Sequence, residues 1–202
     1  MQEQEVIKSL QSDLRFNDSS INKLKIFVKS VIDVNKEHNF ISKSTEGDIW
    51  HRHVLDSAQL VKFISFKKGS LADLGSGAGF PGIVLAIFNT NLSFHVKLYE
   101  KSAVKSTFLK RIVKELDLNA EILGNIYDDN IDSEYIVCRA FKKLNRIIQV
   151  SRETARKPHR LIVLKGQNAQ EEINNALKKK KYAYKLENSM TNNKSKILIA
   201  DF

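Results

Sequence analysis

The stretch that decides the fold is Leu71-Ala-Asp73-Leu-Gly75-Ser-Gly77-Ala-Gly79-Phe-Pro81-Gly82-Ile-Val-Leu-Ala-Ile87. It predicts a short buried strand that ends in an acid, then a glycine-rich turn, then a helix. The turn needs glycine because the chain reverses sharply and brings its backbone against a ligand, which a Cβ would block. Pro81 suits the first turn of a helix, where a missing N–H costs nothing. The stretch therefore predicts a site for a nucleotide cofactor.

The loop alone does not choose the cofactor, because its glycines also match the G-x-G-x-x-G spacing of dinucleotide enzymes. Asp73 precedes Gly75 by two residues, and the loop follows a long segment of mostly helical pattern; both features favour S-adenosylmethionine over NAD. A second acid, Glu100, ends the next predicted strand and is placed to bind ribose hydroxyls, as the equivalent acid of a Rossmann unit does. The alternative is a plain tight turn with Glu100 as a solvated strand end, but a turn alone needs neither three glycines nor two acids.

Composition limits the class of protein. The chain has 202 residues, of which 42% are hydrophobic, which suits one compact unit with an appendage. A single cysteine, Cys138, excludes an internal disulfide and leaves no cysteine cluster for zinc, so we expect a reducing compartment and no metal. We expect a cytoplasmic protein, because the start lacks a leader pattern and no apolar run approaches the ~20 residues of a membrane span. The net charge of +10 indicates a polyanionic partner, although solvated lysine-rich faces also produce such an excess.

Hydrophobic periodicity predicts an N-terminal helical cap (1–68) followed by an α/β core (69–202), together one compact unit. Apolar residues recur at helical spacing over 21–34 and 49–64, and a further helix is expected near 3–14. Beyond Gly69, strands alternate with helices, which predicts a doubly wound, mostly parallel sheet. The strands are expected near 70–74, 94–100, 120–123, 134–138 and 160–165, the helices near 81–88, 102–117 and 142–157, and a closing hairpin at 182–186 and 196–202.

The chain carries further motifs, namely Arg52-His53-Val-Leu55-Asp56-Ser57, Asn35-Lys-Glu-His-Asn39-Phe-Ile-Ser42, Gly79-Phe-Pro-Gly82, Phe108-Leu109, Arg139-Ala-Phe141 and Leu164-Lys165-Gly166-Gln167. In these motifs the chain closely resembles one family, the RsmG (GidB) ribosomal RNA methyltransferases. The Arg52–Ser57 motif is the most specific of them, because generic methyltransferases have no counterpart to it. The resemblance implies a Rossmann-like class I methyltransferase fold with an antiparallel C-terminal strand. It also implies S-adenosylmethionine as cofactor and methylation of a guanine N7 in the decoding-region loop of 16S rRNA.

The resemblance assigns the cofactor site position by position. The residues it implies are Asp73, Gly75, Gly77, Phe80, Glu100 and Arg139, with Ile126 and Tyr127 along the adenine. Asp73 and Glu100 are expected at the two ends of the cofactor, and Arg139 near its methionine end or the incoming base. Members of this family usually carry a carboxylate where Tyr127 stands. Either Asp128 or backbone atoms would then hold the adenine here.

The implied chemistry needs few catalytic groups. Guanine N7 carries a free lone pair, so its methylation removes no proton and needs no general base. Arg139, His53 and Arg52 are therefore expected to position the reactants. In a regular helix Arg52 and Asp56 could instead pair along the surface, and His53 could be structural. We expect a mixed outcome, in which Asp56 and Ser57 fix the cap onto the sheet while Arg52 or His53 faces the site.

RNA binding is expected along a basic segment. N7 faces the deep, narrow major groove of A-form RNA, so the target must lie in a loop or leave its stack. Residues 139–165 include nine Lys or Arg against one acid, Glu153. Of these cations, the four expected to contact RNA, besides Arg139 at the site, are Lys142, Lys143, Arg146 and Lys165. The run Lys178 to Lys181 is more typical of a solvated segment or a guarded sheet edge.

Three functions remain open from the sequence. The favoured one is a monomeric rRNA methyltransferase that acts on the RNA or on a ribosomal particle. A methyltransferase of the same fold acting on a protein or small molecule is disfavoured by the basic charge and the Arg52–Ser57 motif. A non-catalytic RNA-binding module or a dinucleotide reductase is disfavoured because both acids and the glycine loop are intact and the chain is too short for a separate reductase domain.

Overall fold

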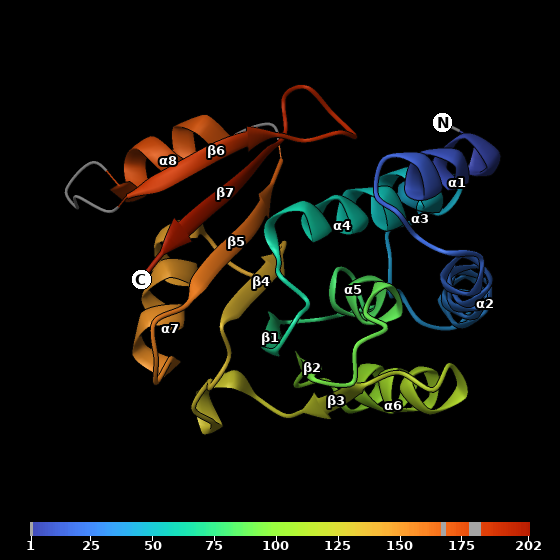
Figure 1. Cartoon of the computed structure of the whole chain (residues 1–202), viewed down its shortest axis with the longest axis horizontal. Helices are drawn as coiled ribbons and strands as arrows, with labels where there is room; N and C mark the ends of the chain where they lie inside the picture. The colour runs from blue at the N-terminus through green and yellow to red at the C-terminus, as the bar shows by residue number, and fades with distance from the viewer. Residues whose placement is uncertain (1, 167–168, 178–182) are drawn as a thin grey trace.

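A seven-stranded sheet organises the part of the chain that the computed structural model describes, residues 2–166, 169–177 and 183–202 (Figure 1). Its strand order is β3-β2-β1-β4-β5-β7-β6. The strands are β1 (Gly69–Leu74), β2 (Phe94–Tyr99), β3 (Ala120–Leu123), β4 (Tyr135–Arg139), β5 (Arg160–Lys165), β6 (Tyr184–Asn188) and β7 (Lys196–Asp201). The five strands and the closing hairpin predicted from the sequence are confirmed, apart from Tyr182, which lies outside the described residues.

The first five strands are parallel, and β7 enters antiparallel between β5 and β6. β1 is central and pairs with β2 on one side and β4 on the other, so the order of the sheet reverses there. At such a reversal the connections after the two strands diverge and leave a crevice at the carboxyl ends of the strands. The loops that follow β1 and β4 therefore border the same crevice.

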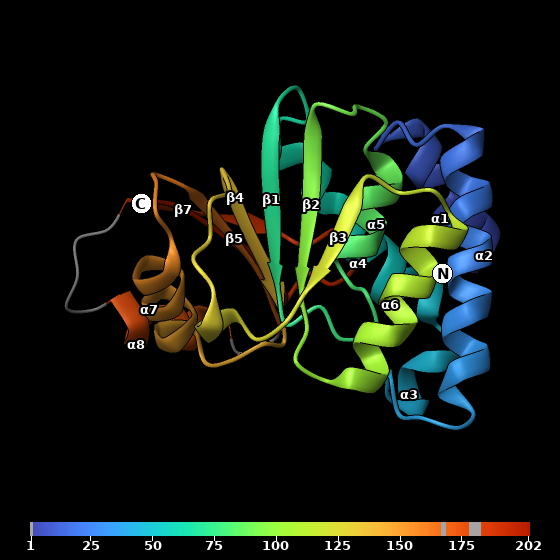
Figure 2. The same cartoon turned by 90° about the horizontal axis from the view of Figure 1, so that it is seen from below.

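Helices cover both faces of the sheet (Figure 2). One side carries α5 (Gly82–Phe88) and α6 (Ala103–Glu115), with the longer α2 (Asp18–Asn35) further out, and the other side carries α7 (Leu144–Thr154) and α8 (Ala169–Leu177). The N-terminal part also contains α1 (Glu3–Ser12), the one-turn α3 (Lys43–Glu46), a π-helical segment (Trp50–Leu55), the short α4 (Asp56–Ala58) and a 3-10 segment (Gln59–Phe63). The doubly wound arrangement predicted from the sequence is confirmed.

The helix α2 shows how the N-terminal segment joins the sheet. Asn17 caps the helix by accepting a hydrogen bond from the Ser20 N–H at 2.8 Å. Its buried face, which includes Leu24 and Phe27, packs in the same apolar cluster as α5 and β1. The Ser20 hydroxyl also donates to the carbonyl of Ile87 in α5 at 3.0 Å. The cap and the sheet therefore share one hydrophobic core.

Three local predictions need correction. The single helix expected over 49–64 is broken into π, α and 3-10 segments, so side chains four residues apart no longer stack as on a regular helix. The helix expected over 142–157 ends at Thr154, because Ala155 is extended and forms a bridge with Ile131. The helix α8 was not expected; its apolar residues are Ala169, Ile173, Ala176 and Leu177, and the others are polar.

Two kinds of feature are absent from the described residues. Among them, no helix combines the length and the apolar character required to cross a lipid bilayer. The same residues contain no cluster of three or more His, Cys, Asp or Glu side chains that could hold a metal ion.

Candidate active site

The glycine loop runs from the end of β1 to the start of α5, and two of its glycines show why this residue is needed. Gly75 and Gly77 have φ values of 71° and 58°, in the left-handed region that other residues rarely adopt. A Cβ on Gly75 would lie 2.5 Å from a ring carbon of Phe141, in the loop after β4. A Cβ on Gly77 would meet no atom closer than 3.8 Å. The loop therefore packs tightly on one side and leaves open space at Gly77.

Asp73 lies beneath this loop. Its carboxylate is fully buried, and Oδ2 accepts a hydrogen bond from the Gly82 N–H at 3.0 Å. Among the described residues, Oδ1 has no hydrogen-bond partner. Burial raises the pKa of Asp73 to about 7. Asp73 does not line the cavity; this acid ties the start of α5 to β1.

A cavity of about 610 Å³ opens in front of the loop, at the carboxyl ends of β1, β2 and β4. Apart from Asp73, it contains every residue that the sequence assigns to the cofactor. The predicted residues that line it are Gly75, Gly77, Phe80, Glu100, Ile126, Tyr127 and Arg139. Its volume lies within the range typical of small-molecule sites.

Glu100 closes the cavity at the end of β2. Its Oε2 accepts from the Gly77 N–H at 2.9 Å, and its Oε1 accepts from the Ser102 N–H at 2.7 Å. Each carboxylate oxygen can accept more than one hydrogen bond, so both keep capacity for a ligand hydroxyl. Glu100 therefore fixes the glycine loop and presents acceptors to the cavity.

The side of the cavity assigned to adenine is formed by a 3-10 turn, Ile126–Asp128. Ile126 is buried, whereas Tyr127 is 46% exposed. Lys142 and Arg146 lie over the Tyr127 ring, at 5.9 and 5.7 Å from its centroid. Of the alternatives raised by the sequence, Asp128 is not among the lining residues, whereas Asn125, which the sequence did not single out, is.

The cap contributes a further wall that sequence reasoning missed. Phe40 and Ile41 line the cavity, and their N–H groups donate to Oδ1 of Asn35 at 2.8 and 3.0 Å. Asn35 in turn donates to Glu46 at 2.6 Å. The Asn35–Ser42 motif was the available signal, since its asparagine folds the chain back after α2.

Arg139 and His53 form the far wall of the cavity. The Arg139 guanidinium donates to the Arg52 carbonyl at 3.0 Å and to Nδ1 of His53 at 2.6 Å, and it lies 5.3 Å from the centroid of Phe80. Nε2 of His53 lies 2.9 Å from the Thr45 hydroxyl. Burial, then the charges of Arg139 and Arg52, lower the pKa of His53 to about 3. His53 is therefore neutral near pH 7, accepts from Arg139 and donates to Thr45.

The Arg52–Ser57 motif does not form a regular α-helix. Asp56 lies 3.6 Å from Arg139 and accepts from the Thr191 hydroxyl at 2.8 Å, so the pairing of Arg52 with Asp56 is wrong. Ser57 donates to the His53 carbonyl in its own helix at 2.6 Å, so it does not fix the cap to the sheet. Asp56 does link the cap to β4 and to the loop before β7.

A second cavity, of about 650 Å³, lies on the other side of this wall. It shares His53, Arg139 and Ala140 with the first cavity. It extends between the cap, the end of β5, α8 and the loop between β6 and β7. Its other polar lining residues are Thr45, Arg52, Asp56, Lys165, Glu172, Ser189, Thr191, Asn192, Ser195 and Lys196.

The cations of the basic segment, residues 139–165, differ in exposure and in pairing. Lys142 is exposed and lines the first cavity, Lys143 is exposed next to it in the chain, and Arg146 is half-buried. Lys165 lines the second cavity, but its ammonium pairs with Glu172 at 2.8 Å and its side chain is only 12% exposed. Its charge is already compensated, so the predicted contact with phosphate is not supported. Gln167 and the Lys178–Lys181 run lie outside the described residues.

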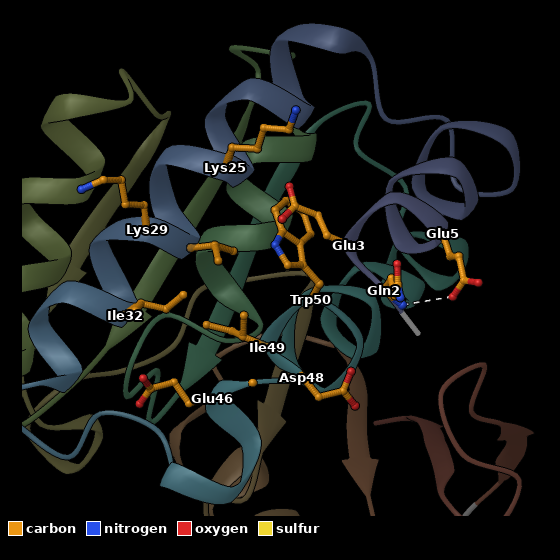
Figure 3. Close-up of a pocket in the computed structure, with 12 residues that line it drawn as sticks. Gln2, Glu3, Glu5, Lys25, Lys29, Ile32, Glu46, Asp48, Ile49 and Trp50 are labelled. Atoms are coloured by element: carbon orange, nitrogen blue, oxygen red, sulfur yellow. Dashed lines mark hydrogen bonds between the residues drawn. The ribbon is translucent and has the colours of Figure 1, made fainter.

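A third cavity, of about 900 Å³, lies in the cap between α1, α2 and α3 (Figure 3). Lys25 and Lys29 line it from α2, with the Lys29 side chain directed away from Trp50, and Trp50 and Glu3 lie next to each other. Glu46 and Asp48 border its opposite side. It has no glycine loop and does not adjoin the sheet edge, so the candidate active site is the pair of cavities that meet at Arg139.

Comparison with solved structures supports the class that this fold and site define. A SAM dependent methyltransferase from Aquifex aeolicus superposes with a TM-score of 0.59 at 13% identity, covering 86% of this chain and 97% of the other. M. jannaschii TYW2, solved in complex with AdoMet, gives a TM-score of 0.53 at 16% identity over 84% of this chain and 78% of its own. The fold is that of the class I S-adenosylmethionine-dependent methyltransferases.

Sequence comparison then gives the family. The GidB family, described as rRNA small subunit methyltransferase G, matches residues 20–198. The Ribosomal RNA small subunit methyltransferase G of Rickettsia felis is 38% identical over 179 residues, covering 88% of this chain and 91% of that protein. The protein of the same name from Pelagibacter ubique is 34% identical, over 86% of this chain and 84% of its own. The chain belongs to this family of S-adenosylmethionine-dependent methyltransferases.

Proposed function

We propose that the chain transfers a methyl group from S-adenosylmethionine to a guanine N7 in the decoding-region loop of 16S rRNA. The observation that carries the proposal is the meeting of two cavities at Arg139 and His53. One cavity has the features of a nucleoside site, and the other is polar and lined by residues of the cap, β4, β5, α8, β7 and the loop between β6 and β7. A methyl group held at the boundary would face a base that enters from the second cavity.

The first cavity fits the cofactor at both of its ends. Gly77 leaves open space for a ligand to approach the backbone, and Glu100 presents two oxygens to a ribose diol. Ile126 and Tyr127 would contact the adenine, with Asn125 beside them as a polar partner. Phe80 and Arg139 would then lie at the methionine end. Asp73 acts indirectly in this proposal, by holding the loop in place.

The geometry suits a transfer without a general base. When bound, S-adenosylmethionine supplies a sulfonium methyl group, and the transfer forms an N7–carbon bond while the sulfur–carbon bond breaks. No proton leaves, since N7 attacks with its lone pair. Both ring nitrogens of His53 already have partners, in Arg139 and Thr45. His53, Arg139 and the backbone of Arg52 therefore orient the reactants, and alignment supplies up to roughly 7–11 kcal/mol of the lowered barrier.

The proposal also covers how RNA is held, what the cap does and where the protein works. Lys142 lines the first cavity, Arg146 lies over the ring of Tyr127 in its wall, and Lys143 follows Lys142 in the chain; these three cations would hold RNA phosphates near the site. We propose that residues 1–68 act as a cap over the cofactor and residues 69–202 as the catalytic core. We also propose that the chain works as a monomer in the cytoplasm, where its ribosomal substrate is found.

The test is direct transfer of a labelled methyl group. Small subunits that lack the modification would be incubated with the protein and methyl-labelled S-adenosylmethionine, and the RNA would be digested to nucleosides. The proposal expects the label in 7-methylguanosine, at one position in the decoding-region loop. Label in another nucleoside, or only in protein, would contradict it.

A further inference from the structure

We infer that Asp56 and Arg139 together read the target base, and that they select guanine over adenine through the O6 and N1–H positions. The inference rests on the proposed function, because it takes N7 to face the first cavity. Both side chains line the second cavity, and Oδ2 of Asp56 lies 3.6 Å from Nη1 of Arg139. The pair therefore presents an acceptor directly beside a donor.

The acceptor is held in one orientation. Oδ1 of Asp56 accepts from the Thr191 hydroxyl at 2.8 Å, from the Gln59 amide at 3.0 Å and from the Ser189 hydroxyl at 3.4 Å. Among the described residues, the polar partner of Oδ2 is Arg139 alone. The Asp56 side chain is 18% exposed, so a ligand can reach it. Asp56 therefore offers a single oxygen to the cavity.

The donor has spare capacity. A guanidinium carries five N–H groups. Arg139 uses one for the Arg52 carbonyl and one for His53. Even with a third directed at Asp56, two remain for a ligand. Because Arg139 lines both cavities, these groups lie where the reacting edge of a base would pass from one cavity to the other.

The order of these groups matches guanine. On guanine, N7 is followed around the ring by O6, an acceptor, and then by N1–H, a donor. With N7 at the methyl group, O6 meets the Arg139 donors and N1–H meets Oδ2 of Asp56. Adenine carries an amino group in place of O6 and a bare lone pair at N1. Its amino group would then face the Arg139 donors, and its N1 acceptor would face the acceptor Oδ2 of Asp56. Unpaired polar groups in a partly buried site discriminate strongly.

The hydrogen bonds to Oδ1 of Asp56 also predict which part of guanine is not recognised. Since only Oδ2 faces the cavity, Asp56 reads one proton, that of N1. The exocyclic amine at C2 of guanine is then not required. Inosine, which lacks that amine but keeps O6 and N1–H, should fit as well as guanosine.

Binding of mononucleotides tests the inference without relying on turnover. The full-length protein, saturated with S-adenosylhomocysteine, would be titrated with GMP, IMP, AMP and 1-methyl-GMP and followed by NMR. We expect GMP and IMP to bind within about threefold of each other, and AMP and 1-methyl-GMP to bind at least about tenfold more weakly. In Asp56→Asn, the amide places a donor where Oδ2 was, so the preference for GMP over AMP should disappear. The matched control, Asp33→Asn on an exposed face of α2, should keep it.

Each contrary result is informative. Equal binding of GMP and AMP, no measurable binding of GMP, or a preference that survives Asp56→Asn would overturn the inference. If Asp56→Asn no longer binds S-adenosylhomocysteine, Thr191→Val replaces it, since this change removes the shortest of the three hydrogen bonds that orient Asp56 and should weaken GMP binding but not AMP binding. Methyl transfer to small subunits by the wild type is measured in parallel. Formation of 7-methylguanosine without a preference for GMP would reject the inference alone, whereas the preference without methyl transfer would reject the proposed function.

Discussion

Replacing Asp73 by asparagine should make the protein more stable at neutral and alkaline pH, although this acid lies directly beneath the cofactor loop. Burial raises the pKa of Asp73 from its usual 3.8 to about 7. At 1.36 kcal/mol per pH unit, ionisation of the folded protein above pH 7 costs about 4 kcal/mol that the unfolded chain does not incur. Asparagine keeps a side-chain acceptor for the Gly82 N–H, and it cannot ionise.

The direction of the Asp73 pKa shift determines how the stability should depend on pH. An acid whose pKa is raised by folding contributes stability that is complete below its unfolded pKa and is lost as the pH rises toward the folded pKa. The free energy of unfolding would be measured with urea for both proteins from about pH 4.5 to about pH 8.5. The advantage of Asp73→Asn over the wild type should grow by about 3–4 kcal/mol across this range.

A matched control separates burial from the loss of any carboxylate. Asp33 is exposed, and hydrogen bonds from Lys29 and Lys36 lower its pKa to about 2, so it stays ionised throughout the range. The difference between Asp33→Asn and the wild type should therefore not change with pH. A constant difference for Asp73→Asn as well, or a wild type that gains stability over this variant as the pH rises, would contradict the prediction. Either result would mean that the loop stabilises the ionised carboxylate.

Three further predictions concern the site. Glu100→Ala removes the acceptor of the Gly77 N–H and should weaken S-adenosylhomocysteine binding by about 1–3 kcal/mol in calorimetry; an unchanged dissociation constant would refute this. Because the pKa of His53 falls to about 3 in the folded protein, the wild type should lose stability relative to His53→Asn as the pH drops below about 6.5, and parallel urea profiles would argue against a buried neutral ring. Lys142→Glu with Lys143→Glu should weaken RNA binding and reduce its salt dependence by about one per residue, with cofactor affinity unchanged; the same loss in Lys110→Glu with Lys114→Glu, on the exposed face of α6, would show a general charge effect instead.

The sequence predicted those parts of the site that backbone requirements determine. The glycines at 75 and 77 adopt left-handed conformations that a side chain would oppose, and Glu100 follows directly from the end of a strand. The parallel sheet and its closing hairpin also follow from the alternation of apolar strands and helices. These features depend on local geometry, which a short stretch of sequence specifies.

What the sequence left open depends on contacts between distant elements. Residues 70–74 of β1 are all buried, so the pattern of apolar residues does not tell on which face Asp73 lies. The π-helical segment that turns His53 toward Arg139 has no signal in hydrophobic spacing. The ion pair between Lys165 and Glu172 joins β5 to α8. It neutralises a lysine that the sequence counts among the cations available to RNA.

The central claim is that the cavity in front of the glycine loop binds the methyl donor and directs the methyl group toward Arg139. A crystal structure with S-adenosylhomocysteine tests it most directly. We expect ribose hydroxyls on Glu100, the adenine beside Ile126 and Tyr127, and the sulfur facing the boundary between the two cavities. Density for the ligand in the cap cavity, or a sulfur directed away from the Arg139 wall, would contradict it.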